Sequence, residues 1–276
     1  MTLNANETNR RGAGAVARLL SIAGSDSGGG AGIQADLKAF AACGAHGMTA
    51  ITAITAQNTV GVSAVHTIPP EIIIAQVRAV LEDIGVDAVK IGMLGTVPTI
   101  EAVAAVLSEL PARTPVVIDP VMVAESGAEL LVPAARQALI ARLLPLATVV
   151  TPNLPEARAL VHGEAADDTD DAAELARAIH ALGPDVVVIT GGHRAQTTDV
   201  FYDGRQLVEI PGPRFASTAA HGSGCTHSSV LAARLAHGDE PLAAARVAKQ
   251  MAAQAVRDGL EAIGHGAGPV RVSSVT

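Results

Sequence analysis

Apolar positions follow two alternating patterns from Arg18 onward. Short runs rich in Val and Ile, which indicate strands, are each followed by a longer segment with apolar residues at helical spacing. The expected strands are 19–23, 48–56, 88–91, 115–118, 148–150 and 186–190. The expected helices are 34–43, 70–83, 99–110, 133–143, 154–162 and 172–182. This alternation predicts βα units that wind around a mainly parallel sheet.

The last third of the chain carries a different pattern. Segments 199–202 and 206–210 flank Asp203-Gly204, a dipeptide typical of tight hairpins, so the sheet is expected to gain a small antiparallel addition. Two Ala-rich helices follow. Without a linker or a shift in composition, one domain is expected over 17–276, after a polar, mobile tail over 1–16. The predicted fold is α/β and doubly wound, with ligands binding at the carboxyl ends of the strands.

Composition and charge restrict the partners of the protein. Hydrophobic residues make up 49% of the chain but aromatic residues only 1%, so the core must be built from Ala, Val, Ile and Leu. The net charge of -8 argues against binding to nucleic acid or to an anionic membrane. Two cysteines are too few for a disulfide framework, and neither a signal peptide nor an apolar span is evident. A cytoplasmic location is therefore expected.

A glycine-rich loop follows the first expected strand. Its sequence, AGSDSGGGAG at 23–32, would let a ligand approach the backbone closely and would offer free N–H groups at the start of a helix. No Gly-Lys-Ser/Thr follows, so the loop is not a P-loop, and no acidic residue completes a dinucleotide-binding motif. A plain flexible connection explains this loop equally well.

A second candidate site is HGSGCT at 221–226, which opens an Ala-rich helix. The amides of Gly222, Ser223, Gly224 and Cys225 would gather at the positive end of the helix dipole, which suits an anion or a transferring phosphoryl group. A thiol at a helix start tends to have a lowered pKa, so Cys225 is expected to be reactive. The alternative is a small, buried and inert cysteine.

A third candidate lies in TPNLPE at 151–156, after another expected strand. Asn153 and Glu156 have the spacing of an ordinary helix cap with its capping-box partner. The functional alternative is Mg²⁺, which keeps several waters and uses few carboxylates. Glu156 with Asn153 could then hold a metal–nucleotide complex through water, and Asp119 at the end of a further strand could add a second acidic contact.

These motifs, taken together and in this order, resemble those of the hydroxymethylpyrimidine/phosphomethylpyrimidine kinases of thiamine biosynthesis. The matching segments are 23–36, 57–61, 90–94, 119–122, 151–156, 191–193 and 221–226. The resemblance covers nearly everything from Leu19 to Val270. It implies a ribokinase-like fold that binds a small pyrimidine, ATP and Mg²⁺, and it allows a homodimer.

The resemblance also assigns roles to individual residues. The residues implied to line the pyrimidine pocket are Gly24, Asp26, Ala31, Gln57, Met93 and Val121, with Gln57 hydrogen-bonding the polar edge of the ring. The residues implied to serve ATP and its metal are Asn153, Glu156, Thr190, Gly192 and Asp119. One departure concerns Thr190, because the family often has Lys at this position, where it could neutralise phosphates. A hydroxyl does not replace that charge, so nucleotide affinity or turnover below the family norm is expected unless another cation compensates.

The predicted activity is transfer of the γ-phosphoryl group of ATP to the hydroxymethyl oxygen of the pyrimidine, and then a second transfer to the monophosphate. Cys225 or water would assist proton removal, and the amides of 222–225 would stabilise the equatorial oxygens. The nearest alternative is a pyridoxal kinase of the same fold. Two alternatives from other classes are a thiol hydrolase or acyltransferase, with Cys225 as nucleophile and His221 or His227 as base, and a non-catalytic pyrimidine-binding protein.

Overall fold

The computed structural model describes residues 15–125, 127–163, 171–192, 197–215, 217 and 219–273. Its strands are β1 (Arg18–Asp26), β2 (His46–Gln57), β3 (Val62–Thr67), β4 (Ala88–Ile91), β5 (Val116–Ile118), β6 (Val149–Val150), β7 (Val186–Ile189), β8 (Asp199–Tyr202) and β9 (Leu207–Ile210). Its helices are α1 (Gly32–Ala42), α2 (Pro70–Asp83), α3 (Val97–Leu107), α4 (Pro133–Arg142), the short 3-10 helix η1 (Leu144–Leu146), α5 (Leu154–His162), α6 (Ala172–His180), α7 (Ser223–Ala236) and α8 (Pro241–Arg257).

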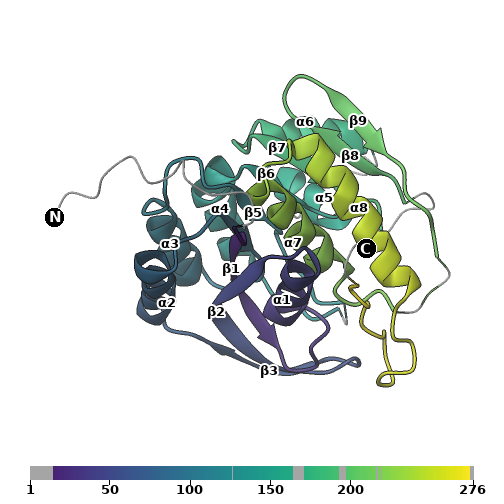
Figure 1. Ribbon diagram of the computed structural model, residues 1–276, viewed down its shortest axis with the longest axis horizontal. Helices are drawn as coiled ribbons and strands as arrows, with labels where there is room; N and C mark the ends of the chain where they lie inside the picture. Colours follow the sequence, from purple (N-terminus) through teal and green to yellow (C-terminus); the bar gives the residue numbers. More distant parts are fainter. Residues whose placement is uncertain are drawn as a thin grey trace.

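The strands form a single sheet in the order β3-β2-β1-β4-β5-β6-β7-β8-β9 (Figure 1). Strands β2, β1, β4, β5, β6 and β7 run parallel, whereas β3 at one edge and β8 and β9 at the other are antiparallel to their neighbours. The chain moves outward from β1 in one direction to β2 and in the other to β4. This change of direction at the carboxyl ends of β1 and β4 is where a doubly wound sheet forms its ligand crevice.

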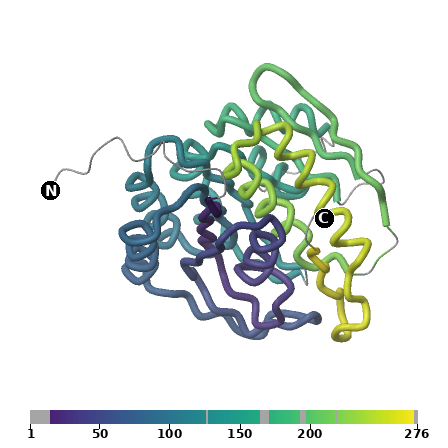
Figure 2. Tube along the Cα trace, viewed as in Figure 1, coloured from purple at the N-terminus to yellow at the C-terminus, as the bar shows by residue number. Residues whose placement is uncertain are grey.

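Two hydrophobic layers hold helices against the two faces of the sheet. Successive strand residues alternate between the layers, since Leu19 and Ala88 pack into one while Leu20 and Val89 pack into the other. Helices α2 to α6 cover the face that carries Leu20, and helices α1, α7 and α8 cover the opposite face. Helices α7 and α8 lie against each other (Figure 2), with small alanine side chains buried on both. The α/β, doubly wound fold is therefore confirmed.

Most predicted elements agree with the structure to within a few residues. Segments 70–83, 88–91, 154–162 and 199–202 have the predicted ends. The predicted helix 99–110 is wrong at both ends, because it begins at Val97, next to the Thr96 cap, and ends at Leu107. The sequence pattern also missed β3, whose side chains are nearly all exposed, so that no alternating apolar run marks it.

Some predictions fall outside the described residues. Most of the predicted mobile tail lies there, because the description begins at residue 15. His193, in the matching segment 191–193, lies there as well. Asp171, directly before α6, caps this helix by accepting hydrogen bonds from the N–H groups of Ala173 and Glu174. Across the described residues, no helix combines the length and apolar character needed to cross a membrane.

Candidate active site

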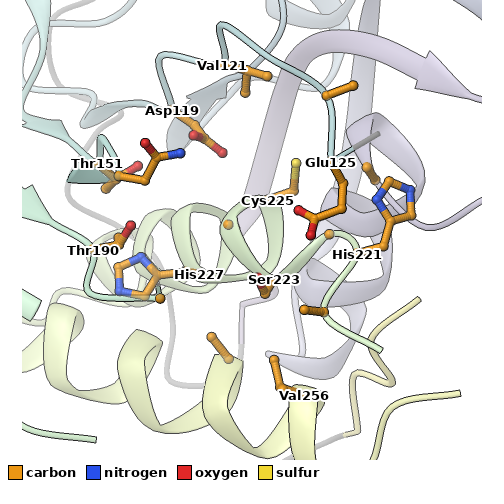
Figure 3. A pocket seen from close by; sticks show the side chains of 18 of the residues that line it. Asp119, Val121, Glu125, Thr151, Thr190, His221, Ser223, Cys225, His227 and Val256 are labelled. Carbon is orange, nitrogen blue, oxygen red and sulfur yellow. The ribbon is translucent and has the colours of Figure 1, made fainter. Parts of the chain in front are cut away.

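A cavity of about 390 Å³ opens at the carboxyl ends of the parallel strands. It is lined by residues from the loop after β1, the ends of β2, β4, β5, β6 and β7, the start of α7, and the inner side of α8. The structure brings all the predicted site residues into its lining: Gly24, Asp26, Ala31, Gln57, Met93, Asp119, Val121, Asn153, Glu156, Thr190, Gly192, Gly222, Ser223, Gly224 and Cys225. His221 and the pair Thr190 and His227 lie at opposite ends (Figure 3).

Asp26 organises the glycine-rich loop from within. Its Oδ1 accepts a hydrogen bond from the Gly28 N–H at 2.8 Å, and its Oδ2 accepts from Gly30 and Ala31 at 3.0 and 2.9 Å. Oδ2 also lies 3.0 Å from Nε2 of His221. Burial opposes ionisation of Asp26, but the bonds from His221 and the loop amides outweigh it and lower its pKa. Asp26 is therefore occupied in shaping the loop that a ligand would contact.

The start of α7 presents backbone donors to the cavity. Gly222 has a φ of +85°, and a side chain there would collide with the Gly30 carbonyl, so the two loops meet closely. The Ser223 N–H donates to Ala220 at 3.0 Å. Among the described residues, no backbone carbonyl accepts from the N–H groups of Gly224 or Cys225. These two amides, at the positive end of the helix, can receive an anion.

The predicted low pKa of Cys225 is wrong. The thiol lines the cavity, yet the surrounding protein removes it from bulk water, and this burial raises its pKa to about 12. Lys90 favours the thiolate, but Asp119 and Asp36 oppose it. The group is a neutral thiol near pH 7. An activated cysteine nucleophile is thereby disfavoured, and His221, one of its two suggested bases, is engaged with Asp26.

Lys90 is an important residue whose role the sequence did not predict. Its side chain is fully buried beside the cavity, with Nζ 2.9 Å from Oδ1 of Asp36 and 3.9 Å from Oδ2 of Asp119. Burial works against the ammonium, but the carboxylates of Asp36 and Asp119 outweigh it and raise the pKa of Lys90 above the ordinary value. Lysine is almost never fully buried without a partner, so a lysine inside the apolar run 88–91 was a usable signal.

Hydroxyl groups complete this buried ionic network. Asp36 accepts hydrogen bonds from Ser21 at 2.6 Å and from Ser229 at 2.7 Å. Asp119 accepts one from Ser228 at 3.0 Å. The network thus connects β1, α1, β4 and β5 to α7, and it fixes the helix whose first amides face the cavity.

Glu156 serves as a helix cap and also faces the cavity. The Asn153 side chain accepts from the Glu156 N–H, and the Glu156 carboxylate accepts from the Asn153 N–H, both at 2.9 Å. Burial and the nearby Asp119 raise the pKa of Glu156 to about 8, and burial likewise raises that of Asp119. Two carboxyl groups that disfavour each other's charge suit a cation that neutralises both.

The residues of the cavity wall fit Mg²⁺ through two carboxylates and not through a larger cluster of protein ligands. The described residues contain no cluster of three or more His, Cys, Asp or Glu side chains that could hold a metal ion. Mg²⁺, however, commonly uses one or two carboxylates and takes its other ligands from water and substrate phosphates. Asp119 and Glu156 provide those two carboxylates at the cavity wall.

The raised pKa of Glu156 predicts a pH-dependent stability. Its pKa is about 8 in the folded state against 4.5 ordinarily, so the folded protein binds the extra proton between these values. Stability from this group is therefore fully present below pH 4.5 and is lost as pH rises through about 8. In metal-free buffer, the melting temperature of the wild type should fall more between pH 5 and 8.5 than that of Glu156→Gln.

Glu101→Gln, on an exposed position of α3, is the matched control and should behave like the wild type. Equal falls in melting temperature for the wild type and Glu156→Gln would contradict the raised pKa.

A second ionic cluster lies at the Thr190 end of the cavity. Nζ of Lys249, on α8, is 2.6 Å from Oδ1 of Asp199, which also accepts the Gly191 N–H at 2.8 Å. Nε2 of His227 lies 3.2 Å from Oδ2 of the same carboxylate. Nothing in the sequence marked Lys249, because lysine on an Ala-rich helix is ordinarily a solvated surface residue. Lys249 places a cation near Thr190, the position at which the family often has a lysine.

The comparisons with known proteins agree on the family. The family model described as "Phosphomethylpyrimidine kinase" matches residues 26–271. A hydroxymethylpyrimidine/phosphomethylpyrimidine kinase from Rhizobium meliloti is 51% identical over 255 residues, covering 91% of this chain and 95% of the relative.

Two solved structures are also similar. A phosphomethylpyrimidine kinase from Clostridium difficile superposes with a TM-score of 0.73 at 41% identity, covering 84% of this chain and 96% of that one. A pyridoxal kinase from Staphylococcus aureus, solved in complex with ADP, has a TM-score of 0.85 at 37% identity and covers 94% of both chains. The motifs that line the cavity and the similarity to these relatives show that the chain belongs to the phosphomethylpyrimidine kinase family.

Proposed function

We propose that this enzyme uses ATP to phosphorylate 4-amino-5-hydroxymethyl-2-methylpyrimidine, and then phosphorylates the monophosphate to the diphosphate, in thiamine biosynthesis. The proposal rests on one observation: Gln57, Met93 and the first backbone amides of α7 line the same cavity. The 51% identity to a kinase of this name supports the same substrate. Because strands from residue 18 to residue 210 share one sheet, we infer one catalytic domain over 17–276.

We assign the acceptor to the end of the cavity near the glycine-rich loop. Gly24 and Ala31 allow the flat ring to lie close to the backbone, and the apolar side chains of Met93 and Val121 provide packing surface. The Gln57 amide remains available to recognise the polar ring edge, although its Oε1 also accepts from Thr55 at 3.0 Å.

We assign the phosphates of ATP to the α7 start and the Thr190 end. The N–H groups of Gly224 and Cys225 would stabilise charge on the transferring phosphoryl group, and Lys249 would add a positive charge. Asp119 and Glu156 would hold Mg²⁺, which supplies charge neutralisation for the phosphates. Because the Cys225 thiol is neutral, water is the better proton acceptor from the hydroxymethyl group, and positioning accounts for most of the acceleration.

The pyridoxal kinase alternative is supported by the Staphylococcus aureus structure, which has the higher TM-score. Both substrates are flat heteroaromatic rings with a hydroxymethyl group. A coupled assay of ADP release should give a higher kcat/KM for the hydroxymethylpyrimidine than for pyridoxal. A higher value for pyridoxal would replace the proposed function with the alternative.

Replacing Gln57 with leucine should weaken pyrimidine binding. An unpaired polar partner costs about 1–3 kcal/mol, which corresponds to roughly a 5- to 150-fold higher KM for the pyrimidine. The KM for ATP should stay unchanged, because Gln57 lies on β2 at the acceptor end. Steady-state kinetics with each substrate varied in turn would check this, and an unchanged pyrimidine KM would remove Gln57 from the acceptor site.

The proposal includes a cytoplasmic location and a homodimer. Both cysteines are free thiols, which suits a reducing compartment.

Strand β3 is a sheet edge where two copies could pair. Val65 on β3 and Ile54 on the neighbouring β2 are about half exposed there. Light scattering should give twice the chain mass, and Val65→Lys should shift the mass toward the monomer. A wild-type monomer at micromolar concentration would exclude this dimer.

A further inference from the structure

His227 is a buried histidine that the phosphoryl-transfer scheme does not use. It lies in the second turn of α7, is only 4% exposed, and belongs to the cavity lining. Nδ1 has no hydrogen-bond partner within the described part of the chain, and Nε2 lies 3.2 Å from Oδ2 of Asp199 without the alignment of a hydrogen bond. Buried polar atoms are usually paired, and an exception of this kind points to a ligand or to a change of protonation state.

The imidazole faces one carboxylate that a lysine already neutralises. Asp199 is 1% exposed, with Lys249 and the Gly191 N–H on Oδ1 and His227 Nε2 3.2 Å from Oδ2. Burial raises the pKa of Asp199, but His227 and Lys249 outweigh it, so the group is ionised. With a neutral imidazole, the charges of Asp199 and Lys249 cancel. With a protonated imidazole, the cluster carries one net positive charge.

Other charged groups also surround His227 or line the cavity. Asp119, directly after β5, is close enough for protonated His227 to favour its ionised form, and Asp119 in turn raises the pKa of Glu156 on α5. The cations Lys90 and Arg214 line the same cavity. Thr190, drawn at the same end of the cavity as His227 in Figure 3, is uncharged.

We propose that His227 takes up a proton when nucleotide phosphates bind, and that the imidazolium then shares Asp199 and frees Lys249 to face the phosphates. His227 is thus a positioning residue, and this inference rests on the proposed use of ATP. Imidazole is the side chain that changes charge between pH 5 and 8. Because ligand binding and protonation are linked reciprocally, nucleotide affinity should decrease as pH rises.

The test is calorimetric binding of MgADP without acceptor substrate. At pH 7.5, titrations in two buffers of different ionisation enthalpy should reveal proton uptake by the wild type, in excess of that in His227→Gln. The wild-type Kd should rise by up to about 10-fold per pH unit between pH 6 and 8.5, while the Kd of the variant stays nearly constant. His227→Leu should give the same result as His227→Gln, which covers the case in which one variant folds poorly.

A charge-restoring variant separates this role from a merely structural one. In the His227→Gln background, Thr190→Lys should restore tight MgADP binding without proton uptake or pH dependence. Equal proton uptake by the wild type and both His227 variants would overturn the inference, and so would a wild-type Kd that does not change with pH. Binding of MgADP without proton uptake leaves the kinase function intact, whereas no binding of MgADP at all contradicts the proposed function itself.

Discussion

Lys90→Met should destabilise the folded protein by about 3–5 kcal/mol, because it removes the ammonium that lies between two buried carboxylates. Methionine is one atom shorter than lysine but keeps most of its apolar stem, so most of the loss should come from charge and little from a cavity. Asp36 and Asp119 would be left buried without the ammonium 2.9 and 3.9 Å away. Urea denaturation at pH 7.5, followed by circular dichroism, measures the change in the free energy of unfolding.

Arg78→Met is the matched control, because it removes one partner of an exposed ion pair with Glu109 and should change stability little. The double variant Asp36→Asn/Lys90→Met should recover part of the loss by removing one unpaired charge. If Lys90→Met and Arg78→Met had equal effects, the network would not hold the site together.

Gly222→Ala should lower kcat by at least about 100-fold, since a small displacement of catalytic groups can have an effect of this size. The backbone φ of +85° disfavours a side chain, and its Cβ would collide with the Gly30 carbonyl. To relieve that contact, the start of α7 must move away from the glycine-rich loop. This would displace the amides of Gly224 and Cys225 from the phosphoryl group.

Gly238→Ala provides the control for backbone strain alone. Gly238 follows the same helix at its other end and has a φ of +94°, but a side chain there meets nothing within 4 Å. It should lose some stability and keep its kcat. Melting temperatures with steady-state kinetics on both variants would check the prediction. Similar kcat values for the two variants would show that the contact between Gly222 and Gly30 does not position the site.

Local pattern was sufficient to predict most of the sheet and helices. The apolar run 88–91 and the Pro-initiated helix 70–83 have sequence signals that lie within the elements themselves. Strand β3 had no such signal, because Val62, Ala64 and Val65 are among largely exposed side chains at a sheet edge. Their strand conformation depends on antiparallel pairing with β2.

The gathering of the site motifs was predictable, but their electrostatics were not. Carboxyl ends of parallel strands meet at one edge, so loops after different strands converge. The pKa of Cys225, however, depends first on its burial and then on Lys90, Asp119 and Asp36, which come from distant parts of the chain. The contact between Asp26 and His221 joins residues 195 positions apart, and no local pattern indicates it.

The most direct test of the central claim is mass spectrometry of the products formed from 4-amino-5-hydroxymethyl-2-methylpyrimidine and Mg-ATP over time. Our account predicts that one phosphate is added first and that a second is then added to the monophosphate, with two ATP consumed per diphosphate formed. Inactivity of Glu156→Gln/Asp119→Asn under the same conditions would assign both transfers to this cavity. Recovery of unmodified pyrimidine from the wild type, or ATP consumption only when pyridoxal is supplied, would contradict the account.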